Sequence, residues 1–554
     1  MALRFAQPAD EAYRFPLTIG HLLDNAVAIS AGREIVYRDQ LRYDYRTFRE
    51  RVGRLASVLE SAGTQEGTTV AVMDWDSHRY LECYFAIPMM GAVLFTVNVR
   101  LAPAQIAYTL DHSRAEILVV HHDFLPIIES IRTQLPHIQA VIAIADGADI
   151  ALPAFACGEY EALGATADPG FEFRDFDENA LATTFYTTGT TGNPKGVCFS
   201  HRQIVLHTLA AKGPFGVTED GGLGHGDVYM PLTPMFHAHA WGMPYVATLL
   251  GLKQVYPGRY EPDFILDLKE KEGVTFSHCV PTILRMLLSA AVQREINLSP
   301  WLLKIGGSAL TPELCREGMR KGMRLISGYG MSETAPIVAA ARWRSLDDDE
   351  DAQVASMTAS GVPIPLVSAR LVDSDMNPVP ADGRSQGELV LRAPWLTPCY
   401  VGDEMASKAL WRGGWLHTQD VATIDPDGTI IIRDRLKDVI KSGGEWLSSL
   451  DLESLIAAAD GVSEVAVIAV PDARWGERPI AIVTGNGVVS PTLESCNAHI
   501  ATAIAQGRAS RFALLDRLEV IGTLPRTSVG KVDKKALRAR YAIDGTPDCP
   551  SVAD

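Results

Sequence analysis

The stretch "YTTGTTGNPKGV", from Tyr186 to Val197, contains four threonines, three glycines and a lysine, and almost nothing that could fill a core. Glycine adopts backbone angles that are closed to other residues, and it lets a ligand approach the main chain closely. The threonine hydroxyls and exposed N–H groups are donors, and Lys195 adds positive charge. Donors and a cation on a bendable loop suit the phosphates of a nucleotide. A solvated surface turn is the alternative, and the loop alone does not decide between the two.

This loop lacks the spacing of a P-loop. A Walker A motif has a glycine, four further residues, and then Gly-Lys-Ser/Thr. Here Gly192 is followed by Asn193, Pro194 and Lys195, and the residue after the lysine is Gly196. The spacing therefore disfavours a P-loop kinase.

Segments upstream of the loop alternate between strand-like and helix-like patterns. β-Rich runs lie at residues 68–75, 115–123 and 137–146. Residues 45–63 place apolar side chains on one helical face and end at a glycine, which is a good stop signal. Alternating strands and helices predict an α/β fold built from layers of largely parallel sheets.

The bulk properties exclude several classes of protein. The chain has 554 residues, too many for one compact core, and a formal net charge of −17. We therefore expect two or more domains and no nucleic acid partner, because phosphate backbones need a basic surface. The longest apolar run, residues 83–95, is too short to span a bilayer, and no signal peptide is visible. Eight scattered cysteines without a C-x-x-C pair are typical of reduced thiols, so we expect a cytoplasmic protein with no membrane partner.

A domain boundary is expected near "DGTIIIRDRLKDVIKSGGEW", which begins at Asp427. Beyond it, the sequence predicts a helix from about Leu450, an alternating strand at residues 463–470 and a basic end at residues 530–540. We expect residues 1–434 to form the large N-terminal domain and residues 435–554 a small C-terminal domain. Clefts between domains are favoured ligand sites.

The loop resembles the phosphate-binding signature of the adenylate-forming superfamily, which includes acyl-CoA synthetases, luciferases and peptide-synthetase adenylation domains. Six further segments resemble the other motifs of this superfamily in the same order. They are "PLTPMFHAHAWG" (231–242), "GGSAL" (306–310), "GYGMSET" (328–334), "GWLHTQD" (414–420), "DRLKDVIKSGGEW" (434–446) and "PRTSVGKVDKKALR" (525–538). The last two lie at the start and towards the end of the small domain. "SGGEWLSS" and "MFHAHAWG" are most similar to bacterial medium-chain fatty acyl-CoA and methylthiopropionyl-CoA ligases.

The resemblance implies a fold and a reaction. The fold would be a large N-terminal domain of layered sheets and helices with a small, mobile α+β C-terminal domain. A small-molecule carboxylic acid would attack the α-phosphate of ATP to give an acyl-adenylate and pyrophosphate. Coenzyme A would then displace AMP to give an acyl-CoA. ATP, coenzyme A and Mg²⁺ are the implied cofactors, and a homodimer is compatible with the resemblance. The alternative is an adenylate-forming enzyme with another acceptor, either oxygen or a carrier protein.

Four residues carry the implied nucleotide chemistry. Tyr329 offers a flat face for adenine, where stacking contributes about 1–3 kcal/mol per base. Asp420 can accept hydrogen bonds from both ribose hydroxyls, and Arg435 can donate to the same ribose. Glu333 offers a hard oxygen ligand for Mg²⁺ and is placed in the catalytic set. Without the motifs, Tyr329 would be interpreted as a core tyrosine, Glu333 as a surface acid and Arg435 as part of a surface salt bridge.

The other residues expected to bind ATP or coenzyme A come from the same motifs. Near Gly443, the absence of side chains would leave room for the narrow pantetheine arm. The complete set is Thr187, Thr188, Gly189, Thr190, Thr191, Gly192, Lys195, Gly307, Ser308, Ala309, Gly328, Gly330, Met331, Ser332, Thr334, Lys437, Lys441, Ser442, Gly443, Gly444 and Glu445.

The resemblance assigns the central catalytic role to Lys531, which would bridge the attacking carboxylate and the α-phosphate. Thr188 and His237 complete the catalytic set. His237 is either a gate between acyl pocket and pantetheine tunnel or a packed core histidine. Trp241 and Gly306, with His237, are the expected acid-binding residues.

Three positions depart from the family pattern. Gln419 stands where glycine is usual beside the ribose-binding aspartate, Ser332 replaces threonine, and His239 replaces a common asparagine. The first leaves the ribose geometry open, and the last leaves open the character of the acyl pocket.

Overall fold

The computed structural model describes residues 3–148, 150–187, 193–213, 222–342, 349–443, 445–506, 508–526 and 532–541. One layer of the large domain is a seven-stranded sheet in the order β7-β6-β5-β3-β4-β8-β9. Its strands are parallel except that β9 runs antiparallel to β8. Their bounds are β3 Thr69–Met73, β4 Val93–Thr96, β5 Ile117–His121, β6 Ala140–Ile144, β7 Gly158–Glu159, β8 Leu181–Thr187 and β9 Lys195–Ser200.

The second layer is a nine-stranded sheet in the order β16-β15-β14-β13-β12-β10-β11-β1-β2. Its centre, from β14 to β1, is parallel, and antiparallel strands complete both edges. The early strand β1 pairs with β11, and Val36 lies opposite Val255. The bounds are β1 Glu34–Tyr37, β2 Leu41–Asp44, β10 Val228–Pro231, β11 Lys253–Tyr256, β12 Phe276–Cys279, β13 Trp301–Ile305, β14 Met323–Gly330, β15 Ile337–Ala340 and β16 Val362–Pro363.

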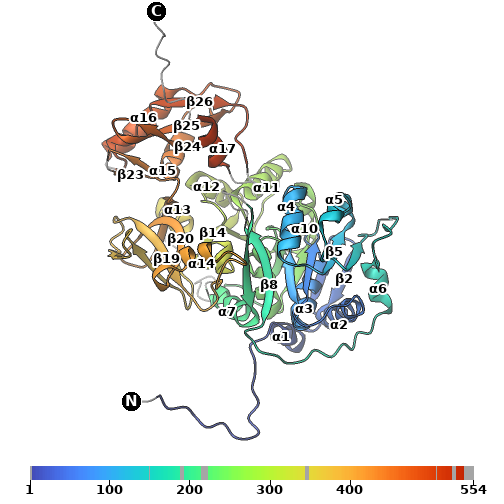
Figure 1. Cartoon of the computed structure of the whole chain (residues 1–554). Coiled ribbons are helices and arrows are strands. Elements are labelled where there is room, and N and C mark those ends of the chain that lie inside the picture. The colour runs from blue at the N-terminus through green and yellow to red at the C-terminus, as the bar shows by residue number, and fades with distance from the viewer. Residues whose placement is uncertain are drawn as a thin grey trace, which may run out of the picture.

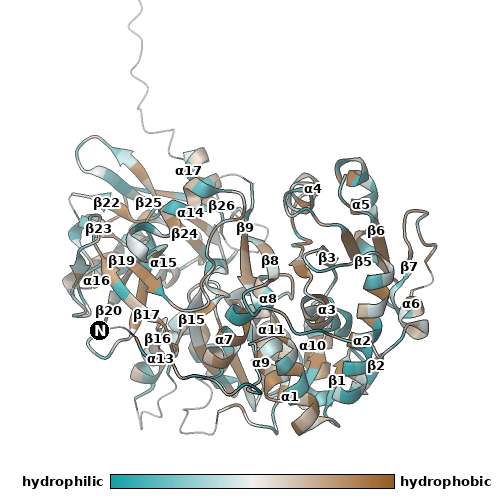
Figure 2. Cartoon of the chain, turned by 60° about the horizontal axis from the view of Figure 1, so that its bottom comes forward, coloured by the Kyte–Doolittle hydropathy of each residue, from teal (hydrophilic) through white to brown (hydrophobic). Residues whose placement is uncertain are grey.

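Helices cover these sheets because the central strands are apolar on both faces. All residues of β5 and β6 are buried, as expected for parallel strands in an α/β layer. In Figure 2, brown hydrophobic strands such as β8 and β9 lie among helices that carry teal hydrophilic residues. The helices of the large domain are α1 Gly20–Ser30, α2 Tyr45–Ser61, α3 His78–Met89, α4 Pro103–His112, α5 Leu125–Ile131, α6 Tyr160–Thr166, α7 His201–Lys212, α8 Ala238–Trp241, α9 Met243–Leu249, α10 Pro262–Glu272, α11 Pro281–Gln293, α12 Pro312–Arg320, α13 Glu350–Thr358 and α14 Glu404–Leu410.

A third sheet and a separate C-terminal sheet follow. The third is antiparallel, with β17 Ser368–Val372, β18 Pro378–Val379, β19 Gly387–Arg392, β20 Leu416–Ile424 and β21 Ile430–Arg435. The small domain contains β22 Ile440–Ser442, β23 Glu445–Leu447, α15 Ser449–Ala457, β24 Val462–Asp472, β25 Gly476–Gly485, α16 Leu493–Ala505, β26 Arg517–Ile521 and α17 Lys534–Tyr541. It has its own apolar clusters and lies at one end of the molecule, in orange and red in Figure 1.

The predicted elements are confirmed. Helix α2 matches the predicted helix, and Asp44 caps its start by accepting from the backbone N–H of Thr47. Strands β3, β5 and β6 match the three β-rich runs, and α15 and β24 match the predicted helix and strand of the small domain. The α/β fold with a large N-terminal and a small C-terminal domain is likewise confirmed. Within the described ranges, none of the helices combines the length and the apolar character needed to cross a membrane.

Candidate active site

A cavity of about 300 Å³ lies where the large domain, β21 and helix α17 meet. Its wall brings together motifs that are more than 200 residues apart in the sequence. The predicted nucleotide-binding residues that line it are Gly307, Ser308, Ala309, Gly328, Tyr329, Gly330, Asp420, Arg435 and Lys437. The small domain contributes Leu450 and residues 532–535 and 538.

Asp420 is the centre of a hydrogen-bonded group on one side of this cavity. It lies on β20 directly opposite Arg435 on β21, and Arg435 Nε is 2.8 Å from Asp420 Oδ1. The hydroxyl of Tyr329 donates to the other carboxylate oxygen, Oδ2. Burial, with the charge of Asp420 next in size, raises the pKa of Tyr329 well above its usual value. The phenol therefore stays protonated and holds the buried carboxylate in place.

Gln419, the departure beside Asp420, has its own contacts. Its backbone N–H and its side-chain amide both donate to Glu388 Oε1, each at 3.1 Å. Its carbonyl oxygen accepts from the N–H of Leu436 at 2.8 Å. The backbone at Gln419 is left-handed, with φ of 60°, a conformation that glycine adopts at lower cost. The contacts to Glu388 hold Gln419 in this strained conformation. The glutamine side chain therefore points toward Glu388, and Asp420 keeps its ion pair with Arg435.

Glu333 lies on a short 3₁₀ turn, Ser332–Thr334, and is buried. Tyr400 donates a hydrogen bond of 2.6 Å to Glu333 Oε1, and the N–H of Thr397 donates to the Glu333 carbonyl at 2.9 Å. Burial is the largest effect on the Glu333 carboxyl and raises its pKa, while the Tyr400 hydroxyl lowers it. A buried carboxylate oriented by Tyr400 fits a hard cation such as Mg²⁺. Tyr400 was missed at the sequence level, because it lies outside every motif.

The phosphate loop is only partly within the described residues. Thr187 and Lys195 pair across the β8–β9 hairpin that carries the loop. The ammonium of Lys195 lies 4.7 Å from the ring centroid of Tyr400, so the loop and Glu333 are linked through one aromatic residue. Thr188, Gly189, Thr190, Thr191 and Gly192 lie outside the described residues.

The segment predicted to line the acyl pocket forms a left-handed turn. Five consecutive residues, Ala238 to Gly242, have φ between 46° and 73°. This conformation is costly for residues with a Cβ, and such strain concentrates at functional sites. The turn directs the Trp241 indole at Gly306, where an added Cβ would lie 3.1 Å from Cη2 of Trp241. The two predicted acid-binding residues are therefore in contact.

The two histidines of this segment differ. His237 is half-buried at the start of the turn. His239 is buried, and its Nε2 lies 2.7 Å from the Thr183 hydroxyl on β8. Burial lowers the pKa of His239 to about 3, so the imidazole is neutral. His239 is thus bonded to the strand that leads into the phosphate loop.

The junction of the two domains is a tight turn. The carbonyl oxygen of Arg435 accepts from the N–H groups of Asp438 at 2.8 Å and Val439 at 2.9 Å. Lys437 lies inside this turn and lines the cavity. Arg538 of α17 reaches back to Asp438, with 2.5 Å between Nη1 and Oδ1. Lys531 itself lies outside the described residues, but Val532 beside it lines the cavity.

The predicted pantetheine residues do not line this cavity. Lys441, Ser442 and Glu445 lie on the β22–β23 hairpin of the small domain. Gly443 at the hairpin tip has φ of 61°, and an added Cβ would lie 2.4 Å from the ring of Phe512. Packing against Phe512 within the small domain therefore requires glycine at this position, whether or not the pantetheine arm passes over the hairpin. Gly444 lies outside the described residues.

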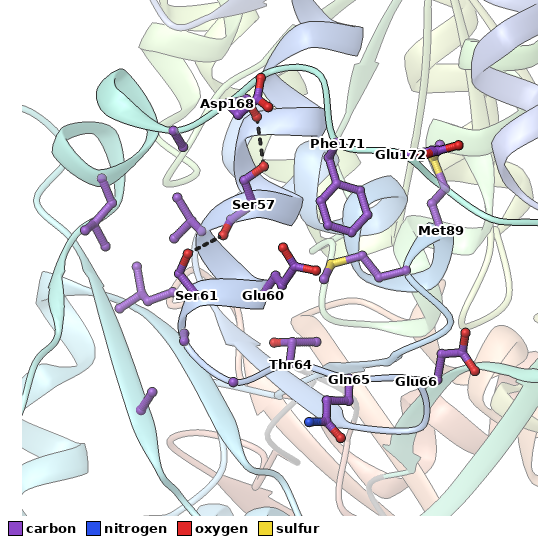
Figure 3. Close-up of a pocket in the computed structure, with 18 of the residues that line it drawn as sticks. Ser57, Glu60, Ser61, Thr64, Gln65, Glu66, Met89, Asp168, Phe171 and Glu172 are labelled. Atoms are coloured by element: carbon purple, nitrogen blue, oxygen red, sulfur yellow. Dashed lines mark hydrogen bonds between the residues drawn. The ribbon is translucent and has the colours of Figure 1, made fainter.

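A larger cavity, of about 1250 Å³, lies elsewhere in the large domain. Figure 3 shows Ser57, Glu60 and Ser61 on α2 facing it, with Phe171 and Asp168 on a segment that crosses the helix. None of the predicted site residues lines it. Its size therefore does not identify it as the site of the chemistry.

Comparison with known proteins follows the same motifs. Residues 23–401 match the AMP-binding enzyme family, and residues 451–531 match the AMP-binding enzyme C-terminal domain. A long-chain-fatty-acid–CoA ligase of Thermus thermophilus is 40% identical over 95% of this chain and 96% of its own length. A 3-methylmercaptopropionyl-CoA ligase of Ruegeria lacuscaerulensis is 35% identical, covering 95% and 97%. The crystal structure of an anthranilate CoA ligase in complex with anthranoyl-AMP has a TM-score of 0.82 at 23% identity, covering 95% and 98%, and shares the fold.

The chain belongs to the AMP-binding enzyme family of adenylate-forming enzymes. Within that family it is an AMP-forming acid–thiol ligase, an acyl-CoA synthetase that uses ATP and coenzyme A. The predicted family and reaction are confirmed by these matches.

Proposed function

We propose that the cavity between the two domains is where this acyl-CoA synthetase forms its acyl-adenylate. The observation that carries the proposal is the Asp420–Arg435–Tyr329 group, which places a buried carboxylate, a guanidinium and an aromatic face around one space. Asp420 would accept from the ribose hydroxyls, and Tyr329 would stack on the adenine. The neighbouring glycines at positions 307, 328 and 330 let the nucleotide approach the backbone.

Glu333 is proposed as the Mg²⁺ ligand on the phosphate side. Lys195 and the Thr/Gly loop would bind the phosphates beside it, and a divalent cation there would offset their negative charge. Tyr400 orients the carboxylate by its hydrogen bond. Thr334 supports the turn by accepting from the N–H of Met331 at 3.0 Å.

Lys531 is proposed as the catalytic lysine of adenylation. A carboxylate and a polyphosphate, both negative, must come together, and a positioned ammonium offsets their repulsion where charge builds up. The position of Val532 in the cavity wall supports this assignment. In the second step, we propose that the domain from residue 435 onward turns about the Arg435–Val439 junction. That turn would bring the β22–β23 hairpin, with Lys441, Ser442, Gly443, Gly444 and Glu445, toward coenzyme A.

The acid is proposed to bind against Trp241 and Gly306, with His237 between that pocket and the path of the thiol. The relatives named above act on fatty acids and on a thioether acid, so a medium-chain acid is the starting point for a substrate panel. We also propose a cytoplasmic location and a homodimeric assembly as parts of this function. The alternative is transfer to oxygen or to a carrier protein. It predicts adenylation that is not followed by formation of a coenzyme A thioester.

The test is to separate the two half-reactions in a Lys531→Ala variant. Pyrophosphate release should fall about 10²–10³-fold, because one positioned electrostatic contact is lost. Thioester formation from chemically made acyl-adenylate and coenzyme A should persist. Arg540→Ala, which removes an exposed cation from helix α17, is the matched control and should leave both steps intact.

Two outcomes would overturn the assignment. A variant that adenylates at the wild-type rate would show that Lys531 is not the catalytic lysine. A correctly folded variant that fails equally on preformed adenylate would show that the residue does not act in the first step alone.

A further inference from the structure

Two cysteines that are far apart in the sequence lie opposite each other beside the candidate site. Cys198 is on β9, the strand that follows the phosphate loop, and Cys399 is in the segment between β19 and α14. An antiparallel bridge joins Val197 to Tyr400, so one step further along each chain places Cys198 opposite Cys399. Both residues are free cysteines.

The buried side chain of Thr397 holds the two cysteine backbones at a fixed spacing. Its hydroxyl oxygen lies 3.1 Å from the carbonyl oxygen of Cys198 and 2.9 Å from that of Cys399. The same oxygen accepts from the N–H of Cys198 at 3.2 Å. Opposite residues of an antiparallel pair have Cα atoms about 4.5–5.5 Å apart, which lies within the range that a disulfide bond can span.

The two thiols differ in their surroundings. Cys198 is 9% exposed, whereas Cys399 is only half-buried. Burial raises the pKa of Cys198 to about 12, and the next causes are the charge of Cys399 and a hydrogen bond between the two side chains. Cys198 therefore stays a protonated thiol in contact with Cys399. Oxidants react first with the more accessible sulfur, which is that of Cys399.

The segment around Cys399 also holds the proposed Mg²⁺ ligand. The N–H of Thr397 donates to the carbonyl oxygen of Glu333 at 2.9 Å, and the hydroxyl of Tyr400 donates to Glu333 Oε1 at 2.6 Å. The ammonium of Lys195 lies 4.7 Å from the centre of the Tyr400 ring. A displacement of Cys399 would therefore be passed on to the groups that orient the carboxylate of Glu333.

We propose that Cys198 and Cys399 form an oxidation site, at which a hydroperoxide converts the two thiols into a disulfide that weakens the binding of Mg-ATP. The formation of the disulfide depends only on the two cysteines. Its effect on Mg-ATP rests on the proposed function, because it acts through Glu333.

The reaction has two steps. The sulfur of Cys399 attacks the peroxide, takes one oxygen to become a sulfenic acid, and the other oxygen leaves as water. The sulfur of Cys198 then attacks that of Cys399, so the S–S bond forms, the S–O bond breaks, and hydroxide leaves with the Cys198 proton as a second water. The two thiols together lose two electrons and two protons, and hydrogen peroxide is reduced to two waters.

The disulfide changes the geometry because bonded sulfurs are closer than sulfurs in contact. An S–S bond is about 2.05 Å long, so closing it draws Cys399 toward β9. Tyr400, the next residue, would then lose its alignment with Glu333. We expect KM for Mg-ATP to rise about tenfold, the effect of one hydrogen bond to a charged group.

The experiment follows the disulfide and the kinetics in the same samples. The full chain is treated with hydrogen peroxide, and mass spectrometry of unreduced peptides should find the Cys198 and Cys399 peptides linked with the loss of two hydrogens. KM for Mg-ATP, measured by pyrophosphate release, should rise in the oxidised sample. Dithiothreitol should remove the link and restore the original KM.

Three variants assign the effect. In Cys399→Ser the link should be absent, and KM should no longer respond to peroxide. In Cys198→Ala oxidation should stop at a sulfenic acid on Cys399, which dimedone traps. Cys157→Ser removes an exposed thiol of the large domain and is the matched control, so it should keep both the link and the response of KM.

The oxidation site is overturned if peroxide that oxidises Cys157 yields no linked peptide of Cys198 and Cys399. The effect on Mg-ATP is overturned if the linked enzyme keeps the KM of the reduced enzyme, or if Cys399→Ser responds to peroxide as the wild type does. These outcomes differ from a failure of the proposed function, in which the reduced enzyme would release no pyrophosphate with any acid. The linked peptide would still decide whether the oxidation site exists.

Discussion

At the scale of single residues, the centre of the molecule is unusually polar for the interior of an α/β domain. Asp420 on β20, Glu333 on the turn after β14 and Lys304 on β13 are all less than 10% exposed. Tyr329 donates a hydrogen bond to Asp420 and Tyr400 donates one to Glu333, while Lys304 lies opposite His278 in the sheet. Such groups lower stability unless they are paired, so their effect can be measured without a substrate.

Lys304 gives a stability prediction with a defined pH dependence. The pKa of Lys304 is about 7 in the folded protein and 10.5 in the unfolded chain. Between these values the unfolded state binds more protons, so the stability of the wild type rises with pH through this window. Below pH 7 both states are protonated, and the full cost of burying the ammonium remains. Lys304→Met should therefore raise Tm most below pH 7, by the equivalent of a few kcal/mol at about 1.4 kcal/mol per pKa unit.

Thermal unfolding of the wild type and of Lys304→Met between about pH 6 and pH 10 measures the gain in stability, at about 1.4 kcal/mol per pKa unit. The gain should shrink steadily as pH rises. A gain that does not depend on pH would mean that Lys304 binds the same number of protons in the folded and unfolded states, so its pKa would not be lowered by folding.

Tyr400→Phe tests the partner of Glu333. The Tyr400 hydroxyl lowers the pKa of a carboxyl that burial has raised. Removing it should raise that pKa further, so the carboxylate is lost at a higher pH than in the wild type. We expect kcat/KM for Mg-ATP to fall about tenfold, the equivalent of one hydrogen bond to a charged group, and its acid limb to move to higher pH.

Kinetics across the acid range measure this shift. Tyr13→Phe removes a similar hydroxyl, bonded to Asp175 at 2.5 Å on the exposed N-terminal segment, and should leave the profile unchanged. An unchanged profile in Tyr400→Phe would mean that Glu333 does not contribute to binding Mg-ATP.

At the scale of secondary-structure elements, strand β21 and the turn after it connect the two halves of the enzyme. β21 belongs to the antiparallel sheet of the large domain, and its last residue, Arg435, accepts both hydrogen bonds of the turn. Leu436 is tied back to Gln419 on β20. The departure at Gln419 therefore lies at the base of the junction, where its left-handed backbone aims the carbonyl oxygen at Leu436.

Lys437→Pro should separate the two half-reactions. Proline fixes φ at residue 437 and disfavours the helical conformation of Leu436 before it, so the junction should lose its freedom to rearrange. Adenylation, followed by pyrophosphate release, should persist, while thioester formation should fall about 10-fold or more, an amount comparable to the cost of a strained backbone residue. Lys437→Ala removes the same side chain without the ring and should retain the thioester step. Equal loss of both steps in a folded proline variant would contradict the idea of a hinge here.

At the scale of the whole molecule, the candidate site is assembled from both domains, so nucleotide binding should stabilise them together. A ligand that binds only the folded state adds about 2.7 kcal/mol at a concentration one hundred times its Kd. ATP should therefore raise the midpoint of thermal unfolding by a few degrees. Asp420→Ala should lose most of that shift, because it removes the partner of both Arg435 and Tyr329. Equal shifts in the two proteins would place the nucleotide elsewhere.

Much of this arrangement was predictable from the sequence, and the reasons for the rest are physical. Helix α2 and strands β5 and β6 follow from local hydrophobic periodicity. The motifs predict that Tyr329, Asp420 and Arg435 form one group, and the structure brings these three residues together. Lys304 and Tyr400 were missed because a lysine inside "WLLKI" and a tyrosine in a loop carry no local signal. The pairing of distant strands buries Lys304, and the path of the loop that carries Tyr400 brings its hydroxyl to Glu333.

Pairing of β1 with β11 has a consequence for how this chain is made. Val36 finds its partner Val255 only after about 220 further residues have been synthesised. A ribosome adding about 5–20 residues per second needs roughly 10–45 seconds for that stretch. During this interval the seven-stranded sheet, which is complete at Ser200, can form, whereas the hairpin of β1 and β2 has no sheet to join. A nascent chain stalled between Ser200 and Lys253 would therefore expose an apolar strand edge to chaperones.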